Sequence, residues 1–422
     1  MRRLVLAWGA FLAVLAAAPA AASAQPMTAA QALTSALNSG MSKIGREASA
    51  YVVDLNTGQT LYSKAANVGR MPASVEKLYT TSTALLRFGP SATLSTTVWG
   101  SGSVNSAGTF DGILYLRGGG DPTFGSSSFD RIAYGTGATV QQLVSNLVRS
   151  QHIKAFDGRI VGDESYFDSL RGTPATGYQA DLPDVEGELS ALSFDRGFAN
   201  LEGTSRQMRP ALYATQQFAA ALKAAGVKVP RNTPIYTGHT PSGMRKLAVV
   251  QSPNMAKLIQ LTNTPSDNYF AEMLLKGLGA RFGGAGTTAA GVAVVRQEVQ
   301  SQFGITPAFD DGSGLSRTDS TTPIQVVTLL QKMYTNPYFF NSLATTGQTG
   351  TLQYEGVGTA AQNVCHGKTG TLHDVANLAG YCRARDGHEL AFAFLANGLG
   401  DPDYVHMIEG NDLAAALAKY DG

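Results

Sequence analysis

Residues 71–79 read Met71-Pro72-Ala73-Ser74-Val75-Glu76-Lys77-Leu78-Tyr79, and this stretch decides the fold and the chemistry expected of the chain. Pro72 precedes a predicted helix, because apolar residues with helical spacing follow it. Ser74 and Lys77 are three residues apart, so a helix places them on one face, one turn apart. A serine hydroxyl needs a base to become a nucleophile, and a lysine amine can be that base when burial or a second cation lowers its pKa. Taken alone, Ser-x-x-Lys also fits an ordinary amphipathic helix.

Two further motifs follow along the chain, Ser266-Asp267-Asn268 and Lys368-Thr369-Gly370. A Ser-x-Asn triplet is not specific by itself, since Ser103-Val104-Asn105 also matches it. The ordered set Ser-x-x-Lys, Ser-Asp-Asn and Lys-Thr-Gly is the signature of serine enzymes that react with penicillins. The sequence therefore predicts a serine enzyme whose three motifs meet at one site.

The three motifs leave two alternatives. A serine β-lactamase of class A would place Glu-x-x-Leu-Asn between the second and third motifs, and none of Glu272, Glu298 and Glu355 begins such a motif. A non-catalytic protein that binds β-lactams or muropeptides on the same fold would typically have lost a motif residue, and all are present here. Both alternatives are disfavoured.

The chain resembles the low-molecular-mass class C penicillin-binding proteins, the D-Ala-D-Ala carboxypeptidase/endopeptidase family. Three longer stretches carry the resemblance beyond the motifs: 119–123, 311–317 and 367–371. The resemblance implies an α/β (α+β) fold, with a serine β-lactamase/DD-transpeptidase-like domain and a mixed α/β insertion between the first and second motifs. It also implies a penicillin-sensitive serine DD-peptidase of peptidoglycan, which cleaves D-Ala-D-Ala, D-Ala-diamino acid cross-links, or both.

The expected domains follow from where the motifs lie. The catalytic domain is expected at 25–90 and 244–422, and the inserted domain at 91–243, which contains none of the three motifs. Within the insertion the pattern predicts short strands at 94–99 and 112–116 and helices at 140–149 and 215–226. The loop Arg117-Gly118-Gly119-Gly120-Asp121-Pro122 lacks the Gly-Lys-Ser/Thr ending of a phosphate-binding loop.

The resemblance also assigns a role to each motif residue. Ser74 would attack the carbonyl carbon and form an acyl-enzyme, Lys77 would take its proton with help from the charge of Lys368, and Ser266 would relay a proton to the leaving amine. Asp267 is expected to cap the following helix, and Asp311 and Ser313 to brace a loop. The expected substrate-binding residues are Asn268, Lys368, Thr369, Gly370 and Thr371. Gly370 would leave room for a substrate strand, and the backbone N–H groups of Ser74 and Thr371 would hold the oxyanion.

The expected partners are peptidoglycan stem peptides and covalent β-lactam inhibitors. A formal charge of +1 provides no basic field for nucleic acid. The chain has no His-Glu-x-x-His motif and no acidic cluster, so neither a metal nor another cofactor is expected. Hydrophobic content of 44% and charged content of 15% suit a globular protein, and 422 residues favour two or more domains.

The N-terminus has the pattern of a cleaved signal peptide at 1–24. Arg2 and Arg3 precede an apolar segment, 4–18, and Ala22-Ser23-Ala24 forms a small-residue cleavage site. Without the two arginines, 30 Lys and Arg remain against 31 Asp and Glu, so the formal charge becomes −1. No later segment is long and apolar enough to span a bilayer. The mature protein is expected to be periplasmic or otherwise extracytoplasmic, with at most peripheral membrane contact.

The two cysteines, Cys365 and Cys382, flank the third motif. If His373-Asp374 is the turn of a hairpin, Cys365 falls directly opposite Cys382, where two side chains can be bridged. An oxidising compartment would let a disulfide form, and two buried thiols are the alternative. Either way the cysteines are structural, because no metal-binding spacing surrounds them.

Overall fold

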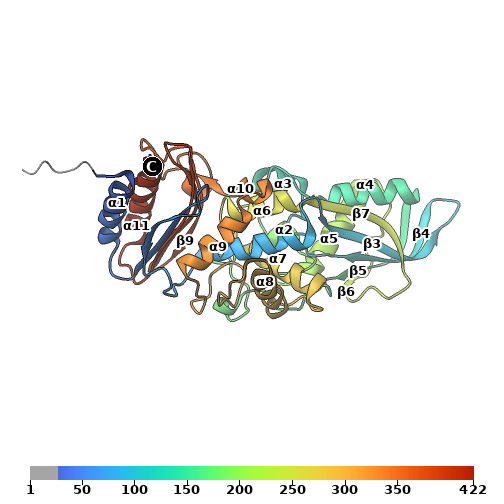
Figure 1. Ribbon diagram of the computed structural model, residues 1–422. Helices are drawn as coiled ribbons and strands as arrows, with labels where there is room; N and C mark the ends of the chain where they lie inside the picture. Colours follow the sequence, from blue (N-terminus) through green and yellow to red (C-terminus); the bar gives the residue numbers. More distant parts are fainter. Residues whose placement is uncertain (1–26) are drawn as a thin grey trace, which may run out of the picture.

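The computed structural model describes residues 27–422, and the predicted signal peptide lies outside them. Figure 1 shows an elongated molecule in which a block of helices separates two β-sheets. The first sheet has the strand order β2-β1-β11-β10-β9-β8 and is antiparallel throughout. Its strands are β1 (Ala48–Asp54), β2 (Thr60–Lys64), β8 (Ala344–Thr345), β9 (Cys365–Leu372), β10 (Val375–Arg383) and β11 (Glu389–Ala396).

Helices cover both faces of this sheet. The outer face carries the first and last helices of residues 27–422 (Figure 1): α1 (Ala29–Ile44), α11 (Pro402–Ile408), a π-helical turn at Glu409–Ala414 and α12 (Ala415–Ala418). The inner face packs on the central block: α2 (Lys77–Phe88), α6 (Met255–Asn263), α7 (Asn268–Phe282), α8 (Thr288–Phe303), α9 (Pro323–Met333) and the short α10 (Pro337–Phe340). Each face has its own apolar core.

Helix α7 lies at the centre of the block and is buried on all sides from Tyr269 to Gly279. A helix that is buried all round normally carries apolar residues alone, yet this one includes Glu272 and Lys276, both with no exposed surface. Buried ionisable groups are retained where they have hydrogen-bond partners. The partners of these two side chains connect α7 to the loop at Gly312 and Ser313 and to the insertion.

The second sheet lies between the first and second motifs and has the order β6-β5-β4-β3-β7. Its strands are β3 (Thr93–Val104), β4 (Thr109–Arg117), β5 (Ala155–Asp163), β6 (Ile235–Thr237) and β7 (Arg245–Asn254); its helices are α3 (Ser127–Ala133), α4 (Val140–Gln151) and α5 (Pro210–Ala224). β4, β5 and β6 run parallel, and the remaining pairs are antiparallel. This mixed α/β unit has a third core, which includes Phe110, Leu143 and Phe218.

Strand β7 changes where the insertion ends. Residues from 244 onward were expected in the catalytic domain, but β7 pairs with β3 from Thr93 to Gly100 and so belongs to the second sheet. The alternation of apolar residues identifies a strand without showing which sheet it joins. We propose that the insertion ends at Asn254, whose side chain caps α6 by accepting from the backbone N–H of Lys257.

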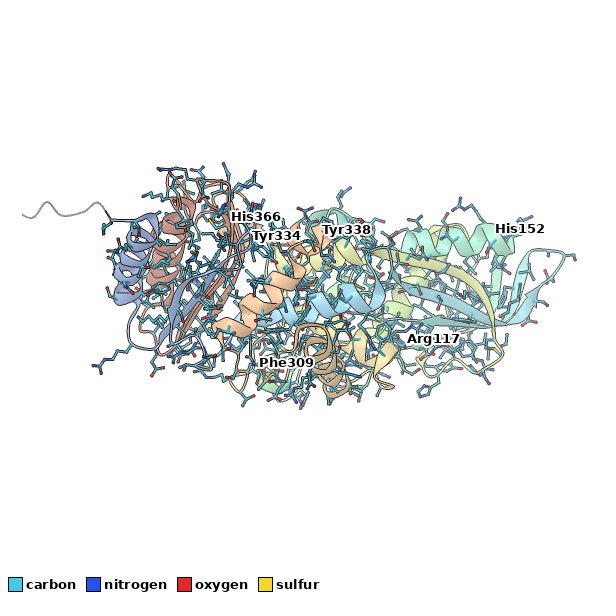
Figure 2. All side chains as sticks on the ribbon, viewed as in Figure 1. Arg117, His152, Phe309, Tyr334, Tyr338 and His366 are labelled. Atoms are coloured by element: carbon cyan, nitrogen blue, oxygen red, sulfur yellow. A yellow bond between two sulfur atoms is a disulfide. The ribbon has the colours of Figure 1, made fainter. Side chains whose placement is uncertain are left out.

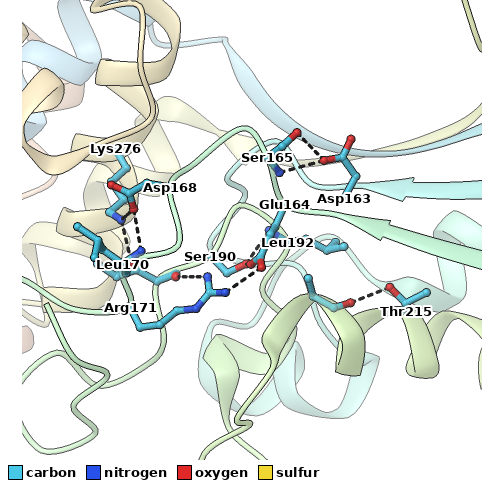
Figure 3. Close-up of polar contacts among 12 residues, drawn as sticks. Asp163, Glu164, Ser165, Asp168, Leu170, Arg171, Ser190, Leu192, Thr215 and Lys276 are labelled. Atoms are coloured by element: carbon cyan, nitrogen blue, oxygen red, sulfur yellow. Dashed lines mark hydrogen bonds and ion pairs between the residues drawn. The ribbon is translucent and has the colours of Figure 1, made fainter. Parts of the chain in front are cut away.

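A long segment between β5 and α5, residues 164–209, returns from the second sheet to the helical block. Figure 3 shows how it is anchored: the Nζ of Lys276 lies 2.6 Å from Asp168 and donates to the carbonyl of Leu170 at 2.8 Å. Arg171 pairs with Glu164 at 2.8 Å in the same segment. The buried lysine of α7 therefore fixes a part of the insertion against the catalytic domain.

The predicted hairpin around the third motif is confirmed. Leu372 pairs with Val375, so His373 and Asp374 form the turn, and Cys365 lies opposite Cys382. The two cysteines form a disulfide. No helix within residues 27–422 is long and apolar enough to cross a membrane.

Phe218→Ala should destabilise the second sheet, because the Phe218 side chain is fully buried in its core. Removing a buried phenylalanine costs about 3–5 kcal/mol. Thermal unfolding followed by circular dichroism should show a lower midpoint, whereas Tyr236→Ala, in exposed β6, should shift it little. Equal shifts for both variants would contradict this assignment of the core.

Candidate active site

Ser74 and Lys77 lie at the junction of a 3₁₀ turn, Ala73–Glu76, and α2. Ser74 is partly exposed, whereas Lys77 has no exposed surface. The Nζ of Lys77 lies 2.8 Å from the Ser74 hydroxyl, 2.5 Å from the Asn268 side-chain oxygen and 2.8 Å from the Ser313 carbonyl. A neutral amine has two N–H groups and one lone pair. It can therefore donate to Asn268 and Ser313 and still accept the proton of Ser74.

Burial lowers the pKa of Lys77 to about 8, although the nearby charges of Asp311 and Glu272 oppose this shift. Burial, and then the charge of Lys77, holds the pKa of Lys368 well below its ordinary value. Of the two causes expected at Lys77, burial and a second cation, the main one is burial, which removes water from around the amine.

Buried carboxyl groups fix the loop that supplies the Ser313 carbonyl. Glu272 accepts from the backbone N–H groups of Gly312 and Ser313, both at 2.9 Å. Asp311 accepts from the N–H groups of Gly314 at 2.7 Å and Ser316 at 2.8 Å, so it braces the loop as expected. Burial, and then the charge of Asp311, raises the pKa of Glu272 to about 8. Sequence reasoning missed Glu272, because it considered this residue only as a β-lactamase base.

The second motif lies at the start of α7. Asp267 caps this helix, as predicted, by accepting from the Phe270 N–H at 2.8 Å. Asn268 bonds Lys77 with its oxygen and donates its amide N–H to the Asp184 carbonyl at 2.6 Å. Ser266 adopts a left-handed backbone, φ +69°, and is partly exposed. The hydrogen bonds of the described residues do not connect its hydroxyl to Ser74 or Lys77.

Arg196, in the insertion, holds the second motif from outside the catalytic domain. Its guanidinium is bidentate to Asp267, with one of the two N···O distances at 3.0 Å, and lies 4.9 Å from the centre of the Tyr269 ring. Both partners of the ion pair are buried. Sequence reasoning did not find Arg196, because nothing local marks an arginine in a long loop as the partner of a distant motif.

The third motif lies on β9 at a sheet edge. β8 pairs with β9 only at His366 and Gly367, so the edge from Lys368 to Leu372 has no strand partner within residues 27–422. Lys368 is fully buried, and the Thr369 hydroxyl donates to that of Thr351 at 2.8 Å. The Thr371 hydroxyl is exposed and lies 2.7 Å from the Nε2 of His406, another residue that sequence reasoning missed.

Gly370 lies against the turn that carries Ser74. A Cβ at this position would clash with the Pro72 carbonyl oxygen, two residues before Ser74. The same carbonyl accepts from the Asn377 side chain at 2.7 Å. Gly370 therefore allows β9 to approach this turn, and the room for a substrate strand expected at Gly370 stays a prediction.

His366, beside the third motif, is structural. Its ring lies 4.7 Å from that of Phe340, and its Nδ1 lies 3.1 Å from the Thr345 hydroxyl. Figure 2 shows His366 and Tyr334 close together where the first sheet meets the helical block. Burial lowers the pKa of His366.

A serine paired with a buried lysine and faced by an open strand edge defines an acyl-transferring serine hydrolase. The sequence profile of the D-Ala-D-Ala carboxypeptidase 3 (S13) family matches residues 29–205 and 198–417, and the chain belongs to this family. The predicted family is therefore confirmed.

Individual relatives agree with this assignment. The chain is 28% identical to a D-alanyl-D-alanine carboxypeptidase of an Actinomadura species, over 88% of this chain and 81% of the relative. It is 30% identical to carboxypeptidase DacB of Mycolicibacterium smegmatis, over 83% of this chain and 76% of the relative. The crystal structure of penicillin binding protein 4 (dacB) from Haemophilus influenzae superposes with a TM-score of 0.71 at 20% identity, over 91% of this chain and 99% of that chain. The predicted fold is confirmed.

Gly370→Ala should slow acylation of the enzyme by benzylpenicillin, because the added methyl group displaces the turn that carries Ser74. A displacement of about 1 Å at a reacting atom can cost about a hundredfold in rate. Gly277→Ala is the matched control, since no atom lies within 4 Å of its new methyl group. Intact-mass time courses would measure both rates, and an unchanged rate for Gly370→Ala would contradict the close approach.

Proposed function

We propose that this protein is a penicillin-sensitive serine peptidase that removes the terminal D-alanine from peptidoglycan stem peptides through an acyl-enzyme on Ser74. The observation that carries the proposal is the 2.8 Å contact between the Ser74 hydroxyl and a buried Lys77 amine. Burial keeps a fraction of this amine neutral near neutral pH, so it can accept the serine proton. Family membership and the two carboxypeptidase relatives support the choice of substrate.

In the first half of the reaction, Ser74 attacks the carbonyl carbon between the two D-alanines while Lys77 takes its proton. The backbone N–H groups of Ser74 and Thr371 stabilise the oxyanion. Ser266 delivers a proton to the departing D-alanine amine, and Asn268 holds both Lys77 and the peptide. In the second half, water attacks the acyl group and releases the shortened peptide.

The third motif receives the end of the substrate. The stem peptide lies along the free edge of β9, where main-chain groups are available for pairing. Its terminal carboxylate is bound by Lys368, Thr369 and Thr371. A β-lactam carries an equivalent carboxylate, so it would bind in the same position as the peptide. It would then acylate the same serine. A structure of penicillin binding protein 4 from Haemophilus influenzae complexed with a β-lactam, similar in fold at a TM-score of 0.67, supports binding of a β-lactam by this fold.

The protein acts outside the cytoplasmic membrane, in the periplasm or an equivalent compartment, after loss of a signal peptide at 1–24. Two observations support this location. The Cys365–Cys382 disulfide requires an oxidising compartment, and the substrate of the family lies in the cell wall. The catalytic domain then comprises residues 25–90 and 255–422.

The decisive experiment incubates the mature protein with benzylpenicillin and follows its intact mass from minutes to hours. A long-lived adduct, absent in Ser74→Ala, supports the proposal, and release of D-alanine from a D-Ala-D-Ala peptide and from cross-linked muropeptides then defines the substrate. Rapid loss of penicillin without an adduct would favour a β-lactamase. No change in the protein or the drug would favour the non-catalytic binding protein.

Acylation should also depend on pH through Lys77. Because the amine must be neutral to accept a proton and its pKa is about 8, the acylation rate should fall about tenfold for each pH unit below about 8. Lys77→Arg keeps the charge but removes the base, so it should abolish acylation. Stopped-flow acylation from about pH 5.5 to 9 would measure the profile, and a flat profile would overturn the role of Lys77.

A further inference from the structure

The Thr371 hydroxyl belongs to a chain of three side chains, and the mechanism above does not use the other two, His406 and Glu409. The Nε2 of His406, on α11, lies 2.7 Å from Thr371, and its Nδ1 lies 3.0 Å from Glu409. The His406 side chain is 12% exposed and that of Glu409 is 1% exposed. The imidazole is thus fixed between a buried carboxylate and an exposed hydroxyl.

The proton on His406 decides what Thr371 can do. Because Nδ1 faces a carboxylate, it carries a proton in both states of the ring, and the two states differ at Nε2. A neutral ring accepts the hydroxyl proton of Thr371, so the threonine presents only lone pairs to a ligand. A charged ring donates to Thr371, and the hydroxyl proton becomes free to bind a carboxylate.

We propose that His406, fixed by Glu409, is a positioning residue that lets Thr371 donate a hydrogen bond to the terminal carboxylate of the substrate. This inference rests on the proposed function, since it concerns the same peptide. The protonated ring also brings a positive charge near the carboxylate, next to the free edge of β9.

The surroundings of His406 favour its charged form. Burial alone would lower the pKa of His406, but the hydrogen bond and charge of Glu409, and then the charges of Glu355 and Asp403, raise it above the ordinary value. The cations on neighbouring elements pair elsewhere: Lys43 of α1 with Asp412 at 2.7 Å, and Arg317 with Asp374 at 2.9 Å. The charged form is therefore present near neutral pH and is lost as the pH rises.

The test measures kcat and KM separately against pH for a diacetyl-Lys-D-Ala-D-Ala peptide. KM should rise about tenfold at alkaline pH, which corresponds to the loss of one charge-assisted hydrogen bond. Over the same pH range kcat should increase, because Lys77 loses its proton. His406→Ala should remove the alkaline rise in KM. Glu409→Gln should shift the rise to lower pH, because the neutral amide no longer stabilises the charged ring. His373→Ala, an exposed histidine on the same hairpin, is the control and should leave the profile unchanged.

If His406 had only a structural role, His406→Ala would change the stability or kcat of the enzyme but would leave the rise of KM at alkaline pH as it is in the parent. An alkaline rise that persists in His406→Ala, or a parent enzyme without one, overturns the inference. Failure of the proposed function is distinguishable, because it would appear as the absence of a benzylpenicillin adduct on Ser74 in the parent enzyme.

A second observation, independent of the first, concerns the junction between the helical block and the second sheet. A cavity of about 530 Å³ lies between the C-terminal ends of α2 and α7, strand β3 and the loop that begins at Arg117. Figure 2 labels Arg117 at this junction. The volume is within the range of about 300–1,000 Å³ typical of small-molecule sites. Gly118 and Gly119, part of the glycine run noted in the sequence, form one wall.

The lining is strongly cationic. Four basic side chains and no carboxylate contribute to it: Arg87, Arg117, Lys246 and Arg281. Two of these cations pair with carboxylates that are not part of the lining: Arg87 with Glu298 at 3.3 Å and Arg117 with Asp163 at 3.7 Å. The ion pairs of residues 27–422 include none for Lys246 or Arg281. These two cations lie instead over the rings of Trp99, at 5.4 Å, and Phe282, at 5.6 Å.

The geometry points to a binding site for an anionic carbohydrate, a sugar that carries a phosphate or carboxylate group. The unpaired cations would receive the anionic group, and the Trp99 and Tyr166 rings offer flat apolar surfaces on which a sugar ring can stack. The site is distinct from the serine centre, because it lies at the C-terminal end of α2 and Ser74 precedes the N-terminal end.

Trp99 makes this inference directly measurable, since it is the one tryptophan within residues 27–422. Fluorescence titrations would use glucosamine 6-phosphate, glucuronic acid, N-acetylglucosamine and inorganic phosphate. One of the two anionic sugars should bind at least about tenfold more tightly than N-acetylglucosamine or phosphate alone. The sugar that binds more tightly identifies the anionic group. The double variant Lys246→Gln/Arg281→Gln should weaken this binding about tenfold, while Lys223→Gln, an exposed lysine on α5, should not.

No response of Trp99 to either anionic sugar, or an equal response to inorganic phosphate, overturns the inference. Unchanged affinity in the double variant also overturns it. Benzylpenicillin acylation of Ser74 should be the same in both variants, which separates this site from the peptidase activity.

Discussion

The burial of Lys77 is the constraint on which the rest of the active site depends. A buried amine needs hydrogen-bond partners or must lose its charge, and Lys77 has such partners as well as a lowered pKa. Its oxygen partners come from three separate segments of the chain, at Ser74, Asn268 and Ser313. These segments converge because apolar residues next to them, such as Val75, Phe270 and Phe309, share one core. The central block of helices thus keeps one amine away from water and beside one hydroxyl.

The parts of the fold that could be predicted depend on local spacing. Ser74 and Lys77 were expected on one face of a helix, one turn apart, and they lie together at the junction of a 3₁₀ turn and α2. The two-residue turn at 373–374 fixed the pairing of Cys365 with Cys382. The remaining parts depend on contacts across the chain. The ion pair of Arg196 with Asp267 joins residues 71 positions apart, and the periodicity of the sequence does not predict it. The pairing of β7 with β3, which places β7 in the second sheet, likewise depends on a distant contact.

The insertion completes the catalytic domain. Asp184 and Arg196 both belong to it, and they satisfy the amide of Asn268 and the carboxylate of Asp267. Lys276 of α7 in turn anchors the segment that carries them. Polar groups buried in this way are costly when a partner is lost. The second motif therefore has its observed geometry because two regions of the chain fold against each other.

The pairing of β1 with β11 joins the first strand of the chain to the last. During synthesis, β1 and β2 emerge from the ribosome long before β11 exists, so the first sheet stays open until the end. Lys368 is likewise supplied late, on β9. A nascent chain that ends before β9 contains Ser74 and Lys77 but has no strand edge to face them. The order of strands in this sheet therefore delays the assembly of the hydrolytic centre until β9, β10 and β11 have been synthesised.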